Sequence, residues 1–191
     1  MIQTQCFMIE ETGQSRLSLR RYREESECPL TPIQTCHNAS RMISVVPTIY
    51  GVRDSRRVIE TRPEQVPPED PRWPTHCECG ESFIGSDVRQ VFQETLWSRV
   101  GTNEEMTLRE WQKHPGAMWD AWWYHPMWLG PDGRSLCVVL PDGREWSIDS
   151  PAKGTNTPWA RTGVPPKITA NPSILTPGYH GWMRDGVLVS C

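Results

Sequence analysis

The chain has 191 residues, the length of one domain or of one domain with an appendage. Its 20 basic and 23 acidic residues leave a net charge of −3, which does not favour a broad basic surface for nucleic acid. Only 36 residues are Leu, Ile, Val or Phe, and ten Trp residues supply apolar volume in their place. Because the net charge is small, this composition predicts a folded chain with an aromatic core.

The start of the chain, MIQTQCFMIEETG, has neither a basic segment nor the run of about 7 to 15 apolar residues of a secretory signal. No window approaches the roughly 20 apolar residues that a membrane helix needs. The seven cysteines are an odd number, which favours free thiols or metal ligands over a disulfide framework. We therefore expect an intracellular protein that has no secretory signal and does not associate with membranes.

The first quarter of the chain is predicted to contain a hairpin, a loop and a strand. A Thr-Gly turn signal at 12–13 predicts that residues 2–23 fold as a hairpin. Residues 28–40 carry two prolines and are typical of a loop that another part of the molecule must hold in place. Residues 42–52 are rich in β-branched side chains, which predicts a strand with Pro47 near an edge or bulge.

The middle of the chain is predicted to hold a connector and two helices. Residues 53–75 are rich in proline and charge, which predicts an extended connector anchored by Trp73. The apolar spacing over 88–100 predicts a helix that Gly101 closes. Thr107 and Glu110 form a capping-box pattern, which predicts a second, short helix.

The last third of the chain has period-two patterning and turn signals. Pro-Asp-Gly turns at 131–133 and 141–143 flank SLCVVL, which predicts a three-stranded antiparallel meander over 127–149. Another Asp-Gly at 185–186 predicts a final hairpin, and residues 150–172 are typical of a long crossing loop. The predicted fold class is α+β: a mostly antiparallel sheet of hairpins and a meander, one or two short helices in the middle, and long loops.

The predicted organisation has three parts. Residues 1–52 form the N-terminal hairpin and loop, residues 53–75 form the proline-rich connector, and residues 76–191 form the main β-rich domain that carries cysteine and histidine. We expect the first and last parts to pack as one unit.

The strongest chemical signal is the segment THCECG at 75–80. Cys77 and Cys79 can point at one ion if the chain turns sharply, and Gly80 permits the positive φ of such a turn. Zinc needs about four ligands and prefers thiolate and imidazole. The remaining ligands would come from Cys28, Cys36, His37, His76, His180 or Cys191. The alternative is that the thiols of this segment are buried small side chains, which is the role expected for Cys6 and Cys137.

Other patterns are weaker. The Trp cluster at 111–128 is expected to form core, although exposed rings could stack on a sugar or a base. Asp120, Asp149 and Glu78 are candidates for a general base beside a metal, but solvated surface carboxylates are the simpler interpretation. Arginines at 20–23 and 53–57 alternate with acids and are expected on an exposed surface where opposite charges pair. The chain contains no GxGxxG, Walker-type lysine loop, HExxH or nucleophile elbow, so no catalytic residue is assigned.

Six segments in order resemble an uncharacterised family of bacteriophage-encoded proteins: RWPTHCECG (72–80), TLRE (107–110), PGAMWDAWW (115–123), GPDGRSLCVVLPDGREWSID (130–149), PSI (172–174) and YHGWMRDGVL (179–188). A shorter bacterial family of unknown function is similar in its CxCG knuckle, PSI segment and late histidine. The resemblance implies Cys77, Cys79 and His180 as joint metal ligands. These families often carry another cysteine before the histidine, where this chain has Thr176-Pro177-Gly178, so Cys36 or His37 would complete the site.

The resulting expectation is a non-enzymatic bacteriophage accessory or virion-associated protein, in the host cytoplasm or the virion. Structural zinc at Cys77, Cys79, His180 and either Cys36 or His37 would fasten its loops, and the protein would act by binding a phage or host protein. The sequence leaves two rivals: a zinc-dependent hydrolase acting on nucleic acid or cell wall, with Glu78 as its acid, and a carbohydrate-binding module built on exposed tryptophans. It does not indicate an oligomeric state.

Overall fold

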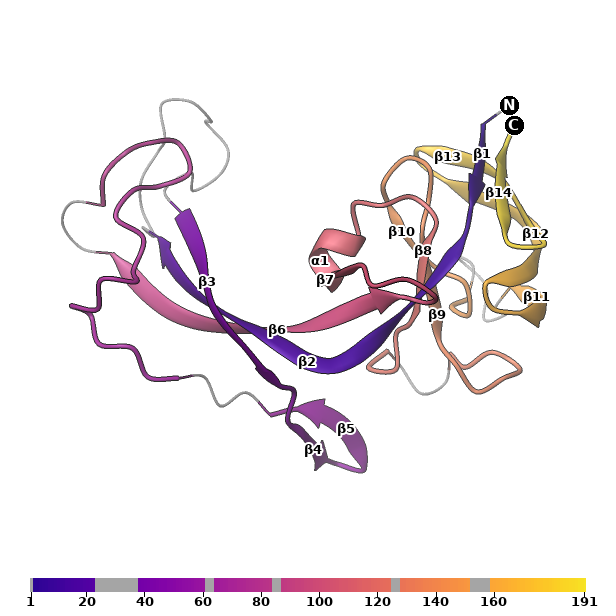
Figure 1. Ribbon diagram of the computed structural model, residues 1–191. Helices are drawn as coiled ribbons and strands as arrows, with labels where there is room; N and C mark the ends of the chain where they lie inside the picture. The colour runs from indigo at the N-terminus through magenta and orange to yellow at the C-terminus, as the bar shows by residue number, and fades with distance from the viewer. Residues whose placement is uncertain (1, 23–37, 61–63, 84–86, 125–127, 152–158) are drawn as a thin grey trace. The chain divides into compact units, whose positions relative to one another are not determined.

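The computed structural model describes residues 2–22, 38–60, 64–83, 87–124, 128–151 and 159–191. These residues form fourteen strands and one four-residue helix, which confirms a mostly antiparallel β protein (Figure 1). The chain divides into two compact units. Unit 1 contains Met1–Thr12, Val52–Val58 and Leu96–Cys191, and unit 2 contains Gly13–Gly51 and Ile59–Thr95.

Four strands cross the boundary between the units. They are β2 (Phe7–Tyr22), β4 (Tyr50–Arg53), β5 (Arg56–Ile59) and β6 (Val88–Arg99). Strand β3 (Asn38–Pro47) lies in unit 2 and pairs antiparallel with the second half of β2, with a register shift between Leu17 and Ser18.

Unit 1 contains a five-stranded antiparallel sheet in which the first and last strands of the chain are neighbours (Figure 1). Its order is β1-β14-β13-β12-β11. The bounds are β1 (Gln3–Gln5), β11 (Ala160–Val164), β12 (Lys167–Thr176), β13 (Tyr179–Arg184) and β14 (Val187–Ser190).

A second sheet follows the order β10-β9-β8-β2-β6-β7, and its strands β2 and β6 continue into unit 2. Its remaining members are β7 (Glu105–Thr107), β8 (Ala117–Asp120), β9 (Leu136–Val139) and β10 (Glu145–Ser147). Strands β8, β9 and β10 pair antiparallel, whereas β8 runs parallel to the start of β2. The predicted meander is therefore confirmed in its last two strands, and its first strand comes from Ala117–Asp120 rather than from the residues just before Asp132.

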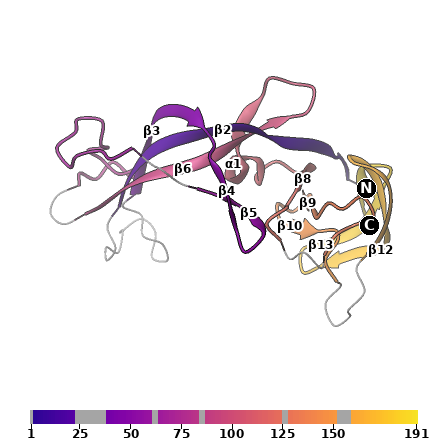
Figure 2. The ribbon, with the colours of Figure 1, turned by 90° about the horizontal axis from the view of Figure 1, so that it is seen from below.

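The core of unit 1 lies on both faces of β8 and β9. Met118 and Val138 join one buried cluster with residues of the five-stranded sheet, near which Figure 2 shows β9 and β10. Trp119 and Cys137 face the other way, into a cluster with Trp111. Strands buried on both faces have near-continuous apolar sequences, which explains the run LCVVL.

The predicted hairpin over 2–23 is wrong, because β2 continues as one strand through the Thr-Gly signal. Gly13 does adopt a positive φ of 74°, yet the chain does not reverse there. The Thr12 hydroxyl donates to the Leu96 carbonyl at 3.0 Å, and Gln14 pairs with Pro47. Long-range pairing on both sides of the glycine therefore overrides the local turn preference.

The predicted helix over 88–100 is also wrong, since these residues form β6. The segment VRQVFQETLWSR is rich in β-branched and aromatic side chains, which suit a pleated surface. Its last residues pair with β7, with Trp97 opposite Met106. The apolar spacing matched a helical period, but in the strand only Leu96 and Trp97 are buried.

The short second helix is confirmed as α1 (Leu108–Trp111). The Thr107 amide donates to the Glu110 carboxylate at 2.8 Å, and the Glu110 amide donates to the Thr107 hydroxyl at 3.4 Å. These two bonds are the predicted capping box. α1 is the only helix in the described part of the chain, and it is too short to span a membrane.

Three further expectations have mixed outcomes. The final hairpin is confirmed, with Asp185 and Gly186 both at positive φ between β13 and β14. The expected strand over 42–52 is divided into β3 and β4. The crossing loop expected over 150–172 is wrong from residue 160 onward, where β11 and β12 form a hairpin. Pro165 and Pro166 form the tight turn of this hairpin, while Gly163 lies in β11 and Pro172 in β12.

A buried ion pair joins the two strand groups of unit 1. Arg161 of β11 has a side chain that is 1% exposed, and its Nε lies 2.7 Å from Oδ1 of Asp149, just after β10. The other oxygen of Asp149 accepts from the Leu136 amide at 2.8 Å. Asp132 forms a second ion pair with Arg161. Each charge is thus paired and hydrogen-bonded, as burial requires.

Replacing Arg161 with Met is expected to lower the free energy of unfolding by about 3–5 kcal/mol, because Asp149 would remain buried without its cation. Urea denaturation of the two proteins measures this difference. As a matched control, Arg144→Met removes an exposed partner of Asp142 and should cost less than about 1 kcal/mol. Equal effects of the two substitutions would contradict the assignment.

Candidate functional site

The segment THCECG forms a tight knuckle in unit 2. The Cys77 amide donates to the Glu81 carbonyl at 2.8 Å, and the Gly80 amide donates back to the Cys77 carbonyl at 2.9 Å. His76 and Ser82 form an antiparallel bridge that closes its base. Gly80 has a φ of 90°, so the positive φ expected from the sequence is confirmed.

The two knuckle sulfurs converge. Sγ of Cys77 lies 2.7 Å from Sγ of Cys79, and the Cys79 amide donates to the Cys77 sulfur at 3.2 Å. This separation is longer than the ~2.05 Å of a disulfide, and neither cysteine is in a disulfide. Burial raises the pKa of Cys77, and its contact with Cys79 raises it further. The arrangement places two soft ligands on one side of the turn.

The knuckle packs on the start of β3. Cys77 forms a small buried cluster with Ala39 and Phe83, and the Glu78 amide donates to the Asn38 carbonyl at 3.0 Å. The first described residue of β3 is therefore attached directly to the cysteine turn.

Arg21 of β2 holds the segments that flank the knuckle. Its guanidinium makes two hydrogen bonds to Asp87, of 2.6 and 2.9 Å, and donates to the Pro74 carbonyl at 2.9 Å. It also lies 4.8 Å from the ring centre of Phe83. The expectation that Arg21 belongs to an exposed surface of paired charges is wrong, because only 9% of Arg21 is exposed.

The other predicted ligands are not part of this described cluster. His180 is an exposed residue of β13 in unit 1, with its ring 5.9 Å from that of Trp182. His76 is exposed, and its Nδ1 lies 3.0 Å from the Thr75 hydroxyl. Cys28, Cys36 and His37 lie outside the described residues. In the ranges that the structure describes, no three His, Cys, Asp or Glu side chains form a group that could hold a metal, and zinc stays a prediction.

The tryptophans are divided between core and surface. Those with less than a tenth of their surface exposed are Trp73, Trp97, Trp111, Trp119 and Trp146, which supports the expected aromatic core. Trp73 is anchored as predicted, its Nε1 donating to the Pro67 carbonyl at 2.7 Å. Trp123 is 45% exposed and lies edge-on to Trp97 and Trp122. Its use as a ligand platform stays a prediction.

The carboxylates named as candidate bases have different environments. Asp149 is buried in its ion pair with Arg161, so the expectation of a solvated surface acid is wrong for this residue. Burial raises the pKa of Asp120, whose Oδ1 accepts from the Ser135 amide at 3.0 Å. Glu78 is exposed beside the knuckle. Cys6 and Cys137 are buried in the core as expected.

Comparison with known proteins adds no assignment, since no family model, curated protein or solved structure matches the chain.

Unit 2 is expected to lose stability in acid because of Asp87. Arg21 lowers the pKa of Asp87, and Arg89 lowers it further. A carboxyl whose folded pKa is depressed stabilises the fold above its unfolded pKa of about 3.9 and stops doing so as pH falls through the folded value. We expect Asp87→Asn to be less stable than the wild type at pH 6, with the gap closing below about pH 4. Urea denaturation midpoints from pH 2 to 6 measure this difference in stability. Glu69→Gln, which replaces an exposed acid, is the control, and its midpoint should differ from that of the wild type by the same amount at every pH.

Proposed function

We propose that this chain is a non-enzymatic binding protein, a bacteriophage accessory or virion-associated protein, whose knuckle holds a structural zinc. It acts by binding another protein. The observation that carries the proposal is the convergence of the Cys77 and Cys79 sulfurs on a turn with hydrogen-bonded backbone amides. The proposed bacteriophage origin rests on the resemblance of six sequence segments to a family of bacteriophage-encoded proteins.

The knuckle has the chemistry of half a zinc site. Zinc–sulfur bonds of ~2.3 Å in a tetrahedron place two sulfurs about 3.8 Å apart. The two sulfurs at 2.7 Å would separate by about 1 Å around an ion, which rotation of two side chains can supply. The Cys79 amide already donates to the Cys77 sulfur, and such a bond stabilises a thiolate. The donor set is soft, as zinc prefers.

The remaining ligands are proposed from chain connectivity and from the resemblance. Cys36 and His37 directly precede Asn38 in the sequence, and Asn38 is hydrogen-bonded to Glu78 of the knuckle. His180 is the ligand that the resemblance implies. Four protein ligands would leave no open position, which is the arrangement of a structural rather than a catalytic zinc.

The small local core is the reason for assigning the metal a structural role. The cluster at the knuckle contains only three buried side chains, those of Ala39, Cys77 and Phe83. A core of this size stabilises little on its own, and a metal that binds only the folded chain adds its binding free energy to folding. In the proposed role, zinc fixes the loops at this end of unit 2 into one surface for a partner protein.

Purified protein is expected to contain one zinc per chain by elemental analysis. Cys77→Ser and Cys79→Ser should each reduce the zinc content to well under one and lower the melting temperature, since a thiolate ligand is lost. His114→Ala, which removes an exposed histidine of unit 1 that is not a candidate ligand, is the control and should retain the metal. Cobalt substitution provides a second readout, because its absorption reports thiolate ligands and would weaken in the knuckle variants.

The same assay separates the ligand alternatives. Cys36→Ser, His37→Ala and His180→Ala should lower zinc content only where the residue binds the metal. Wild-type protein with well under one zinc per chain, or a Cys77→Ser melting curve identical to the wild type, would refute the zinc proposal.

A further inference from the structure

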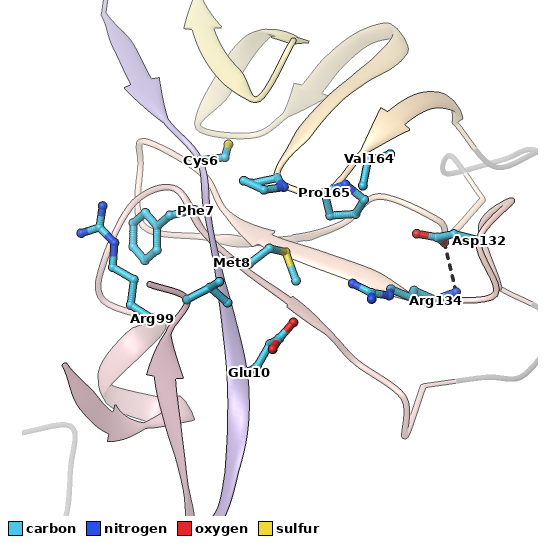
Figure 3. Close-up of a pocket in the computed structure, with 11 residues that line it drawn as sticks. Cys6, Phe7, Met8, Glu10, Arg99, Asp132, Arg134, Val164 and Pro165 are labelled. Carbon is cyan, nitrogen blue, oxygen red and sulfur yellow. Dashed lines mark hydrogen bonds between the residues drawn. The ribbon is translucent and has the colours of Figure 1, made fainter. Parts of the chain in front are cut away.

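A cavity in unit 1, remote in sequence from the knuckle, has the composition of a recognition site. Its volume is about 590 Å³, within the range of natural ligand pockets. Four segments line it: the start of β2, the end of β6, the loop around residue 132 and the loop around residue 165 (Figure 3). We propose that this cavity binds the C-terminal residue of a partner polypeptide, with an apolar side chain inside and the α-carboxylate on Arg134.

The cavity wall is apolar. Met8, Val164 and Pro165 supply aliphatic surface, and Pro166 adjoins them in the turn between β11 and β12. Burial raises the pKa of Cys6 to about 12, so its thiol is neutral at physiological pH and adds to the apolar wall. A wall of this kind stabilises an apolar side chain that leaves water.

The rim offers a cation, Arg134, that has no ion-pair partner in the described structure, although its charge acts on Asp120 and lowers the pKa of that carboxyl against the larger effect of burial, which raises it. Arg134 is exposed and forms no ion pair there, although its amide donates to Asp132 in the local turn. Figure 3 shows its side chain directed toward Met8 and Glu10. A guanidinium binds a carboxylate through two parallel hydrogen bonds, so Arg134 suits a terminal carboxylate beside the apolar wall.

The other charged groups of the rim indicate which further polar group the ligand carries. Asp132 is already paired with Arg161, and Arg99 lies over the Phe7 ring, 4.3 Å from its centre. Glu10 is exposed, has no ion-pair partner in the described residues, and faces the same cavity as Arg134. A peptide backbone supplies the matching pair of groups, because its N–H can donate to Glu10 while its carboxylate accepts from Arg134.

The inference rests on the proposed protein-binding function and names a recognition site for it. Because no residue that lines the cavity is a proposed zinc ligand, zinc content and peptide binding are independent readouts. Failure of the peptide to bind would leave the zinc results unchanged, and loss of zinc would leave the cavity residues intact.

The test is calorimetry of the full chain with acetyl-Gly-Gly-Leu bearing a free C-terminal carboxylate. The same peptide with an amidated C-terminus should bind about tenfold more weakly or not at all, since a hydrogen bond to a charged group is lost. Arg134→Gln should cause a similar loss. Arg109→Gln, an exposed arginine on α1, is the matched control and should bind like the wild type.

Two further measurements keep the result decisive. Glu10→Gln retains an acceptor for a peptide N–H, so binding of the acetylated peptide should change less than about threefold. Methyl resonances of Met8 and Val164 should shift on peptide addition in the wild type. Equal affinity for the acid and the amide, binding of free leucine as tight as that of the peptide, or no shift at Met8 and Val164 would overturn the proposal.

Discussion

Each unit of this protein is organised around a buried arginine paired with an aspartate. In unit 1, Arg161 joins the five-stranded sheet to the β8–β10 meander through Asp149, and in unit 2 Arg21 joins β2 to the segments beside the knuckle through Asp87. The chain has few aliphatic residues, so its apolar clusters alone leave long segments weakly held. A guanidinium compensates because one side chain can bind several carbonyl and carboxylate oxygens from different loops at once.

The cavity of unit 1 and the knuckle of unit 2 differ in how much of each site the packing of the fold already holds in place. The cavity of unit 1 is formed by strands and a tight turn packed on a large core. The knuckle of unit 2 rests on three buried side chains and on hydrogen bonds to Asn38 and within its own turn. A metal would therefore contribute more at the knuckle than anywhere else in the described chain, since it would replace packing that the sequence does not supply.

Local signals predicted the elements whose chemistry is local. The capping box at Thr107, the Asp185-Gly186 turn and the Gly80 knuckle each depend on residues within a few positions, and all three were correct. The Thr-Gly signal at Gly13 and the helical spacing of β6 failed because pairing with distant strands decided those segments. Arg21 and Asp149 could not be recognised as buried, since their partners lie far away in the sequence. The cavity combines residues from four separate segments, and no spacing rule connects them.

The pairing of β1 with β14 gives the first residues of the chain a protective role. Gln3, Thr4 and Gln5 cover Val189, Leu188 and Val187 at the rim of the five-stranded sheet. Proteolytic trimming of these polar residues would leave β14, with its valines and leucine, as an open edge whose peptide groups can pair with another molecule. The short, polar β1 thus occupies the edge that the apolar β14 would otherwise expose.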